Sequence, residues 1–239
     1  MSIVYKPPGY LNTEIANKEK EKLNKKKVCI CGKLDPLAEG ELLLLFDNEC
    51  KLMNSYLSKR KIYQWEIVWG LQTDTEDVMG LIQNDININF DENYLLEIIN
   101  TFVGDYLQNF HHYSSIQVKN SSLEKNPLWK WSKENRLDEI VIPNKLVNVK
   151  YIKLLNTKKI NLNSIKPNII NTIKKVQGDF RQTEIISQWE EYPNKEYYVS
   201  KFEADVSSGF YIRELVKQLG ISTNYLGLTL NINKIKIIV

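Results

Sequence analysis

The stretch GKLDPLAEG at residues 32–40, followed by ELLLLF at residues 41–46, indicates how the first part of the chain folds. Asp35 precedes Pro36, and a following proline disfavours the helical conformation and favours an extended one. Glycines at both ends of the stretch allow tight turns. The apolar run after it has the length of a strand buried on both faces. The sequence therefore predicts a stiff loop that presents the Asp35 carboxylate and leads into a buried strand.

Outward from this strand, the spacing of apolar residues predicts the remaining elements. Alternation over residues 62–69 puts Tyr63, Trp65, Ile67 and Trp69 on one face of a strand and polar residues on the other. We expect an α/β protein of the α+β type, in which helices flank a central mixed or antiparallel sheet. Further strands are expected at 115–118, 146–155, 197–206 and 228–239, and helices at 13–27, 52–60, 92–103 (ended by Gly104) and 210–219 (ended by Gly220).

Composition narrows the class of protein. The 239 residues are 43% hydrophobic, which is enough for one large domain or two small ones. No apolar run reaches the ~18 residues of a membrane helix, and the amino terminus lacks a signal-peptide pattern. The three cysteines, Cys29, Cys31 and Cys50, are an odd number at spacings that fit no common disulfide framework. We expect an intracellular, cytoplasmic protein with no membrane association.

Metal and cofactor patterns are weak. Cys29 and Cys31 are one residue apart and His111 and His112 are adjacent, and neither pair has the usual zinc spacing. The aspartates of TDTEDVMG, at residues 73–80, alternate with threonines as in a turn, and no calcium-loop pattern follows. Neither GxGxxG nor GxxxxGK occurs. We therefore expect no metal and no cofactor.

Positive charge is concentrated in two places. The formal net charge is only +3, but lysines gather at residues 18–27 and again at residues 59–61, on either side of the Asp35 loop. Alone, such runs are more often solvated faces whose glutamates cancel much of the field. An RNA substrate would give them another role, because lysines neutralise backbone phosphates.

A resemblance to a known family changes the predicted role of the Asp35 loop. An aspartate before a proline opens many ordinary turns, so the loop alone favours a structural role. However, its KLDPLAEG resembles the catalytic motif of the TruB family of pseudouridine synthases. Other family motifs are matched in order along the chain: KPPG at 6–9, KIY at 61–63, GLQTDTEDVMGLI at 70–82 and SSGFYIRELVKQLG at 207–220.

This resemblance implies an RNA-modifying enzyme. The implied fold is that of a pseudouridine synthase, with residues 1–239 as a single catalytic domain and no carboxyl-terminal RNA-binding domain. Within it, the composition of residues 119–144, rich in Lys, Asn, Ser and Trp, predicts an insertion or flap. The implied reaction isomerises uridine to pseudouridine in RNA, without a cofactor, and needs the target base to be flipped out. The expected partner is RNA, in particular the tRNA T-arm, and the expected state is a monomer.

The resemblance also implies roles for individual residues. Asp35 would be the nucleophile, attacking either C1′ of the ribose or C6 of the base. Arg213 would hold its carboxylate by a charge-assisted hydrogen bond. Tyr63 would stack on the flipped uracil and accept or relay the C5 proton, and Tyr211 and Leu228 would line the same pocket.

Two further sets of residues complete the predicted site. Ile30 stands where the family has a histidine that stacks in the bound RNA loop, and isoleucine can fill that space without stacking. The RNA backbone would be contacted from the two lysine-rich segments, through Lys25, Lys26, Lys27, Lys59, Arg60 and Lys61.

Rival classes of function remain at this stage. A non-catalytic RNA-binding or RNA-folding protein could keep the same scaffold, but it would have no need to keep Asp35, Tyr63 and Arg213 together. A carbohydrate-acting hydrolase would need a second acid besides Asp35, and no comparable motif singles one out.

Overall fold

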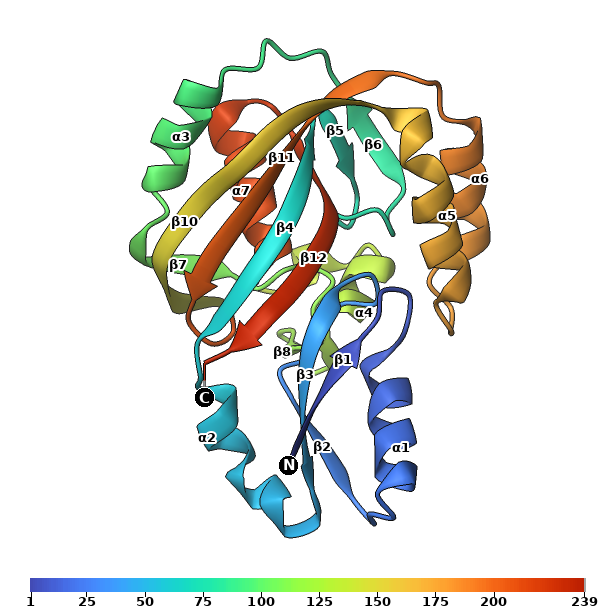
Figure 1. Cartoon of the computed structure of the whole chain (residues 1–239), viewed down its shortest axis with the longest axis vertical. Helices are drawn as coiled ribbons and strands as arrows, with labels where there is room; N and C mark the ends of the chain where they lie inside the picture. Colours follow the sequence, from blue (N-terminus) through green and yellow to red (C-terminus); the bar gives the residue numbers. More distant parts are fainter. Residues whose placement is uncertain (239) are drawn as a thin grey trace.

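One twisted sheet organises the computed structural model, which describes residues 1–238 (Figure 1). Its strand order is β1-β3-β12-β4-β11-β10-β7, and β2 adds to β3. All neighbours are antiparallel except β3 and β12, so the sheet is mixed, as predicted. The strands are β1 Ser2–Lys6, β2 Val28–Cys31, β3 Glu39–Phe46, β4 Lys61–Trp69, β5 Leu71–Thr73, β6 Ile82–Asp85, β7 Gly104–Asn109, β8 Gln117–Lys119, β9 Lys125–Pro127, β10 Asn144–Asn161, β11 Glu196–Val206 and β12 Gly227–Ile237.

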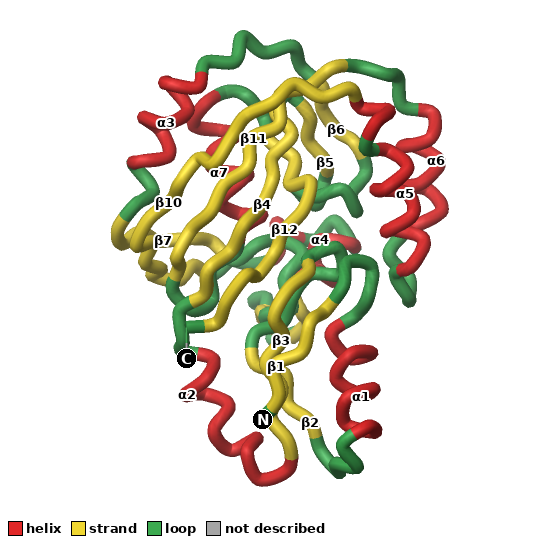
Figure 2. The backbone as a smooth tube through the Cα atoms, in the orientation of Figure 1, coloured by secondary structure: helices red, strands yellow, loops and turns green. Residues whose placement is uncertain are grey.

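Helices cover both faces of the sheet, with α3 at one side of the view and α5 and α6 at the other (Figure 2). Trp65, Ile67 and Trp69 of β4 point into the core under α3 and α7, whereas Val68 points into the core under α5 and α6. The predicted aromatic face of this strand is therefore confirmed. The helices are α1 Asn12–Lys22, α2 Met53–Leu57, α3 Glu92–Asn100, α4 Leu128–Lys133, α5 Lys166–Lys175, α6 Gln182–Glu191 and α7 Ile212–Thr223.

The first three strands form a narrower end of the molecule with α1 and α2, at the bottom of Figure 1. Strand β3 is buried on both faces, as its unbroken apolar run predicts. Leu42 and Leu44 face Ala16 of α1, and Leu43 and Leu45 face the other side, toward α2. Residues 32–38, which join β2 to β3, lie where this end meets the rest of the sheet.

Two buried lysines hold this joining loop by its backbone. Lys6 Nζ donates to the carbonyl oxygens of Pro36 at 3.0 Å and Ala38 at 2.6 Å. Lys234 Nζ, on β12, donates to the carbonyl oxygen of Gly32 at 2.9 Å. Burial lowers the pKa of Lys6 to about 8 and that of Lys234 to about 7. The loop that carries Asp35 is thus fastened on both sides of the aspartate.

The basic segment before β4 is placed differently from our expectation. Lys61 is buried and its ammonium donates to the carbonyl oxygens of Leu57 and Lys59, so it cannot reach an RNA phosphate in this structure. Arg60 is engaged by the Asp205 carboxylate at 2.7 Å. Lysine and arginine in a basic run are usually solvated, which is why sequence reasoning places both residues on the surface. We remove Lys61 from the proposed phosphate contacts.

Helix boundaries differ from prediction where tertiary contacts decide them. Gly220 does not end a helix: α7 continues to Thr223 and ends at Asn224, whose φ is +58°. A Cβ on Gly220 would lie 2.9 Å from the backbone nitrogen of Gly227, so this glycine allows α7 to approach the start of β12. The helix predicted at 13–27 ends at Lys22, the one at 52–60 is reduced to α2, and the one at 92–103 ends at Asn100 before Gly104 opens β7. Val239 of the last predicted strand lies outside the described residues.

Residues 119–144, the expected flap, contain the end of the β8–β9 hairpin, α4 and a short 3-10 turn at Leu137–Glu139. Leu128 and Trp131 of α4 pack on Val118, so the segment has a small apolar cluster of its own. Within residues 1–238 no helix has both the length and the apolar character required to span a membrane.

The buried lysines predict an unusual dependence of stability on pH. A lysine whose folded pKa lies below its unfolded value binds fewer protons in the folded state, so stability rises with pH between the two values. The free energy of unfolding should therefore increase between pH 7.5 and 8.5, as measured by urea titration. In Lys234→Met the slope should fall by up to about 1.4 kcal/mol per pH unit. Lys236→Met, at an exposed lysine of the same strand, is the control and should keep the wild-type slope.

Candidate active site

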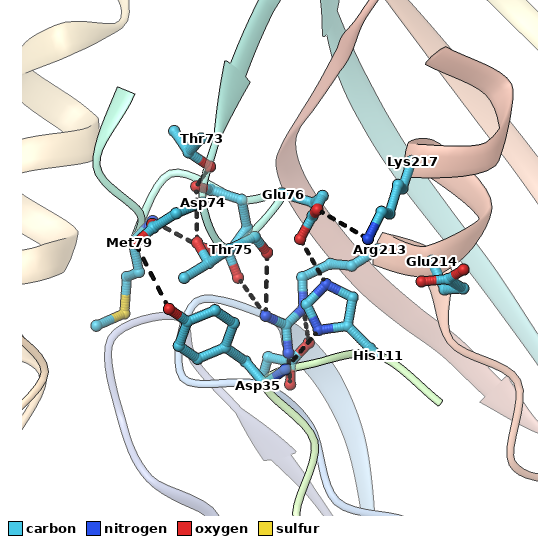
Figure 3. Close-up of polar contacts among 12 residues, drawn as sticks. Asp35, Thr73, Asp74, Thr75, Glu76, Met79, His111, Arg213, Glu214 and Lys217 are labelled. Atoms are coloured by element: carbon cyan, nitrogen blue, oxygen red, sulfur yellow. Dashed lines mark hydrogen bonds and ion pairs between the residues drawn. The ribbon is translucent and has the colours of Figure 1, made fainter. Parts of the chain in front are cut away.

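An arginine and an aspartate that are far apart in the sequence form an ion pair (Figure 3). Arg213 is in the first turn of α7, and Asp35 is on the loop between β2 and β3. Arg213 Nε donates to Asp35 Oδ2 at 2.9 Å, and Nη2 donates to Oδ1 at 2.8 Å. Such a two-point contact fixes the plane of the carboxylate as well as its position. The guanidinium is 6% exposed and the carboxylate side chain 37%, so Asp35 faces outward from a buried partner.

A second carboxylate holds the other side of the guanidinium. Asp77, in the turn between β5 and β6, lies 3.2 Å from Arg213 Nη1 through its Oδ2. Its Oδ1 accepts hydrogen bonds from the Thr75 hydroxyl at 2.8 Å and the Met79 backbone N–H at 2.9 Å. Burial raises the pKa of Asp77 to about 6, although the charge of Arg213 opposes this shift. Asp77 therefore acts as an anchor for Arg213.

A neutral histidine braces the same turn. His111 Nε2 lies 2.9 Å from Glu76 Oε2, and the Tyr113 backbone N–H donates to His111 Nδ1. Because burial lowers the pKa of His111 well below its usual value, the ring is neutral, and its proton is on Nε2 and donated to Glu76. Lys217 of α7 adds an ion pair to Glu76 at 3.6 Å. Glu76 has a φ of +54°, a strained conformation that these contacts maintain.

Asp35 lines a cavity of about 720 Å³, a volume within the usual range of small-ligand sites. The cavity is lined by Leu11, Thr13, Asp35, Pro36, Thr75, Asp77, Met79, Tyr113, Trp129, Lys133, Asp179, Phe180, Arg181 and Arg213.

Two ion pairs include residues that line this cavity. Arg181, from the loop between α5 and α6, lies 2.7 Å from Asp74 Oδ2. Lys133 of α4 lies 2.6 Å from Asp179 of the same α5–α6 loop. Three elements that are separate in the sequence therefore meet around one opening.

Of the residues predicted for the site, Asp35 and Arg213 are brought together and line the cavity. Tyr63 lies on β4 close enough to Asp35 for that charge to raise its pKa, although burial is the larger cause. Tyr211 immediately precedes α7, and its ring meets Phe110 edge-on at 5.5 Å between centroids.

Other predicted residues lie elsewhere. Ile30 packs on the cluster formed by β3 and α1, and Leu228 is fully buried in the core under α5 and α6. Neither is among the residues that line the cavity, and Tyr63 and Tyr211 are not among them either. Lys25, Lys26 and Lys27 are exposed on the turn between α1 and β2, at the far end of the narrow part of the molecule.

Sequence reasoning misses the supporting groups, namely Thr75, Glu76, Asp77 and His111. The stretch TDTEDVMG matches a family motif, but its aspartates have the pattern of a turn and receive no role. The signal available in the sequence is several carboxylates in one short stretch close to glycines. The role of Asp77 depends on its burial, and the sequence pattern does not show burial. His111 is weighed in the sequence only as a zinc ligand. The described residues, 1–238, contain no cluster of three or more side chains suited to hold a metal ion.

Comparison with known proteins shows which family the chain belongs to. A sequence model described as TruB family pseudouridylate synthase (N terminal domain) matches residues 20–169. The chain therefore belongs to the TruB family of pseudouridylate synthases.

Curated relatives in this family are named tRNA pseudouridine synthase B. The protein of Aquifex aeolicus is 25% identical over 235 residues, which are 98% of this chain and 67% of the relative. The protein of Malacoplasma penetrans is 25% identical over 235 residues, 98% of this chain and 83% of the relative. The protein of Alkaliphilus oremlandii is 32% identical over 120 residues, 50% of this chain and 40% of the relative.

Solved structures share the fold at lower identity. A Cbf5-Nop10-Gar1 complex contains a chain that matches with a TM-score of 0.59 and 15% identity, covering 98% of this chain and 48% of that one. An H/ACA RNP bound to a substrate RNA matches with a TM-score of 0.54 and 16% identity, covering 98% and 47%. The chain thus spans about half the length of these structures and has the pseudouridine synthase fold.

The buried arginine makes a strong prediction about stability. Arg213→Met should lower the free energy of unfolding by about 3 kcal/mol at pH 7, because Asp77 is left buried without its cation. Without Arg213 the folded pKa of Asp77 lies further above its unfolded value, so stability falls as pH rises and the deficit should be larger at pH 7 than at pH 5.

Urea unfolding at the two pH values measures both effects. Arg181→Met is the control, since its ion pair with Asp74 is about one-quarter exposed, and it should cost less than half as much. A deficit for Arg213→Met that is small, or equal at both pH values, would contradict the anchoring role of Asp77.

Proposed function

We propose that this chain is an RNA pseudouridine synthase that isomerises a uridine in the T-loop of tRNA. The observation that carries the proposal is the Asp35 carboxylate, which is held at two points by buried Arg213 and lines a cavity of about 720 Å³. Family membership supports it, as do relatives named tRNA pseudouridine synthase B.

The chemistry follows from how Asp35 is held. Each carboxylate oxygen accepts one hydrogen bond from Arg213 and keeps a lone pair for attack. Asp35 adds to C1′ of the ribose or to C6 of the base, the N1–C1′ bond breaks, and the uracil turns so that C5 bonds to C1′. The proton leaves C5, N1 gains a proton and the Asp35 bond breaks, so the atoms balance without a cofactor.

Tyr63 suits stacking and proton relay better than direct proton abstraction. Burial and the nearby Asp35 charge raise its pKa, so its hydroxyl is a neutral phenol at neutral pH. A neutral phenol can stack on a base and can pass on a proton through its oxygen, but it is a weak base. Tyr211 is the residue before α7 and lies two positions before Arg213.

The second carboxylate beside Asp35 is not free to serve as the acid of a hydrolase. Asp77 is a second carboxylate in the cavity, but Thr75 and Met79 occupy one of its oxygens and Arg213 the other. A general acid must be free to reach the leaving oxygen of a substrate, and Asp77 is held in place instead. The arrangement therefore favours a single nucleophile.

The non-catalytic alternative is disfavoured by the buried charges. Burying Arg213 with Asp77 requires desolvation of both groups, and a buried ion pair seldom stabilises a fold more than apolar residues would. An RNA binder needs surface charge and has no use for this pair. An enzyme needs it in order to hold Asp35.

The central test removes the nucleophile and keeps its shape. Asp35→Asn should abolish pseudouridine formation in a T-arm stem-loop, because an amide cannot attack, while RNA affinity stays within a few fold. Product is measured by chemical mapping of pseudouridine, without added metal or nucleotide.

The matched control is Asp105→Asn, at an exposed aspartate on the far edge strand β7, which should keep the wild-type rate. Clear turnover by Asp35→Asn would remove Asp35 from the role of nucleophile. A wild-type protein that forms no product in any T-arm or in total tRNA would overturn the proposed function.

The exposed lysines before β2 are proposed to contact the RNA backbone. Replacing Lys25, Lys26 and Lys27 with Gln should weaken binding to all RNAs alike and reduce the slope of log K against log salt, by about 0.7 to 0.9 for each phosphate that is no longer neutralised. Electrophoretic or fluorescence titration over a salt series measures the slope. Three exposed lysines of β10 (Lys150, Lys153 and Lys158) are the control. Equal slopes for both triple variants would show that these three lysines are an ordinary solvated surface and do not contact the RNA.

A further inference from the structure

A helical hairpin connects two neighbouring strands of the sheet by a long detour. Asn161 of β10 and Glu196 of β11 are register partners, so a tight turn would be enough to join them. Instead, residues 162–195 form α5 and α6, which stand side by side at the edge of the molecule (Figure 1). The loop between the two helices reaches the cavity and contributes Asp179, Phe180 and Arg181 to its lining.

This loop is built to hold one shape. The Gln182 side chain accepts the backbone N–H of Phe180 at 2.9 Å and donates to the carbonyl oxygens of Val176 at 2.9 Å and Gly178 at 2.7 Å. Gly178 has a φ of +101° and Arg181 one of +61°. Two left-handed residues and three hydrogen bonds to one side chain fix the direction of Phe180 between them.

The shape serves to present an aromatic ring at the opening. Phe180 is 36% exposed and lines the cavity, although apolar side chains of α5 and α6 are buried nearby in the core. Trp129 of α4, which is 43% exposed, lines the same cavity. Arg181 lies over the ring of Tyr113, with 6.0 Å from its Cζ to the centroid. Aromatic faces interleaved with cations are what unstacked RNA bases bind.

We propose that the loop at residues 178–181 is a base-binding rim of the active site, on which Phe180 stacks with a base adjacent to the flipped uridine. The inference rests on the proposed function and adds a specificity element to it. Extruding one base leaves its neighbours with an open stacking face, and a rigid aromatic ring at the mouth of the cavity replaces the missing stack.

An ion pair beside the rim is weak enough for RNA to displace it. The Lys133–Asp179 ion pair joins α4 to the rim, and both partners are largely exposed, so it adds little to stability. A phosphate of the incoming strand can take the place of the Asp179 carboxylate on Lys133. The rim itself keeps its shape, since Gln182 and not this ion pair holds it.

The first test compares RNA affinities of variants at the rim. Phe180→Ala should weaken binding of a T-arm stem-loop by roughly 5-fold to 100-fold, whereas Phe180→Trp should stay within threefold of the wild type. Leu96→Ala, at an apolar residue of α3 with 37% exposure, is the control and should not change affinity. A shift in thermal stability for Phe180→Ala without a loss of affinity would show a structural role and overturn the proposal.

The second test identifies the base by a double-mutant cycle. The stem-loop is made with an abasic nucleotide on the 5′ or the 3′ side of the target uridine, and affinity is measured for wild type and Phe180→Ala. For one of the two abasic RNAs, the wild type should bind more weakly than it binds the unmodified stem-loop. Phe180→Ala should bind that abasic RNA and the unmodified stem-loop equally well. Additive losses on both RNAs would overturn the proposal. Wild-type turnover of the unmodified stem-loop is measured in parallel, so that failure of the proposed function is seen separately from failure of the rim.

Discussion

The structure depends on a single guanidinium shared by two carboxylates. Arg213 binds Asp35 at two points and Asp77 at a third, and these residues come from α7, from the loop before β3 and from the turn after β5. No two of the three segments are neighbours in the sequence. Because each contact is directional, the three segments have one relative position in which all of the contacts are made.

Other polar groups around the pair maintain this position. Lys6 and Lys234 hold the backbone of the Asp35 loop, and His111 holds Glu76 beside Asp77. Each is buried and makes a hydrogen bond to another group of the network, and such satisfaction is the condition for a polar network to be tolerated inside a protein. Such a network contributes little net stability, but it gives a single, well-defined site.

Much of the fold and the centre of the site could be predicted from the sequence. The apolar run of β3 and the alternation of β4 are patterns in the spacing of apolar residues, and this spacing can be read from the sequence alone. Asp35 and Arg213 stand out through ordered motifs. The burial of Lys61, Asp77 and His111 could not be predicted, because it depends on which elements pack together. Ile30 was assigned by its position in a motif, but its side chain packs against α1 and β3.

The position of β12 has a consequence for how the protein folds. This strand follows all the others in the chain, yet it lies between β3 and β4 and gives β3 its place in the sheet. During synthesis the first three strands, and with them the Asp35 loop, therefore cannot join the rest of the sheet until β12 has left the ribosome. Pairings between distant segments close slowly, since the loop entropy is lost before the contacts form. The active site is thus completed only when β12 has linked the first three strands to the rest of the sheet.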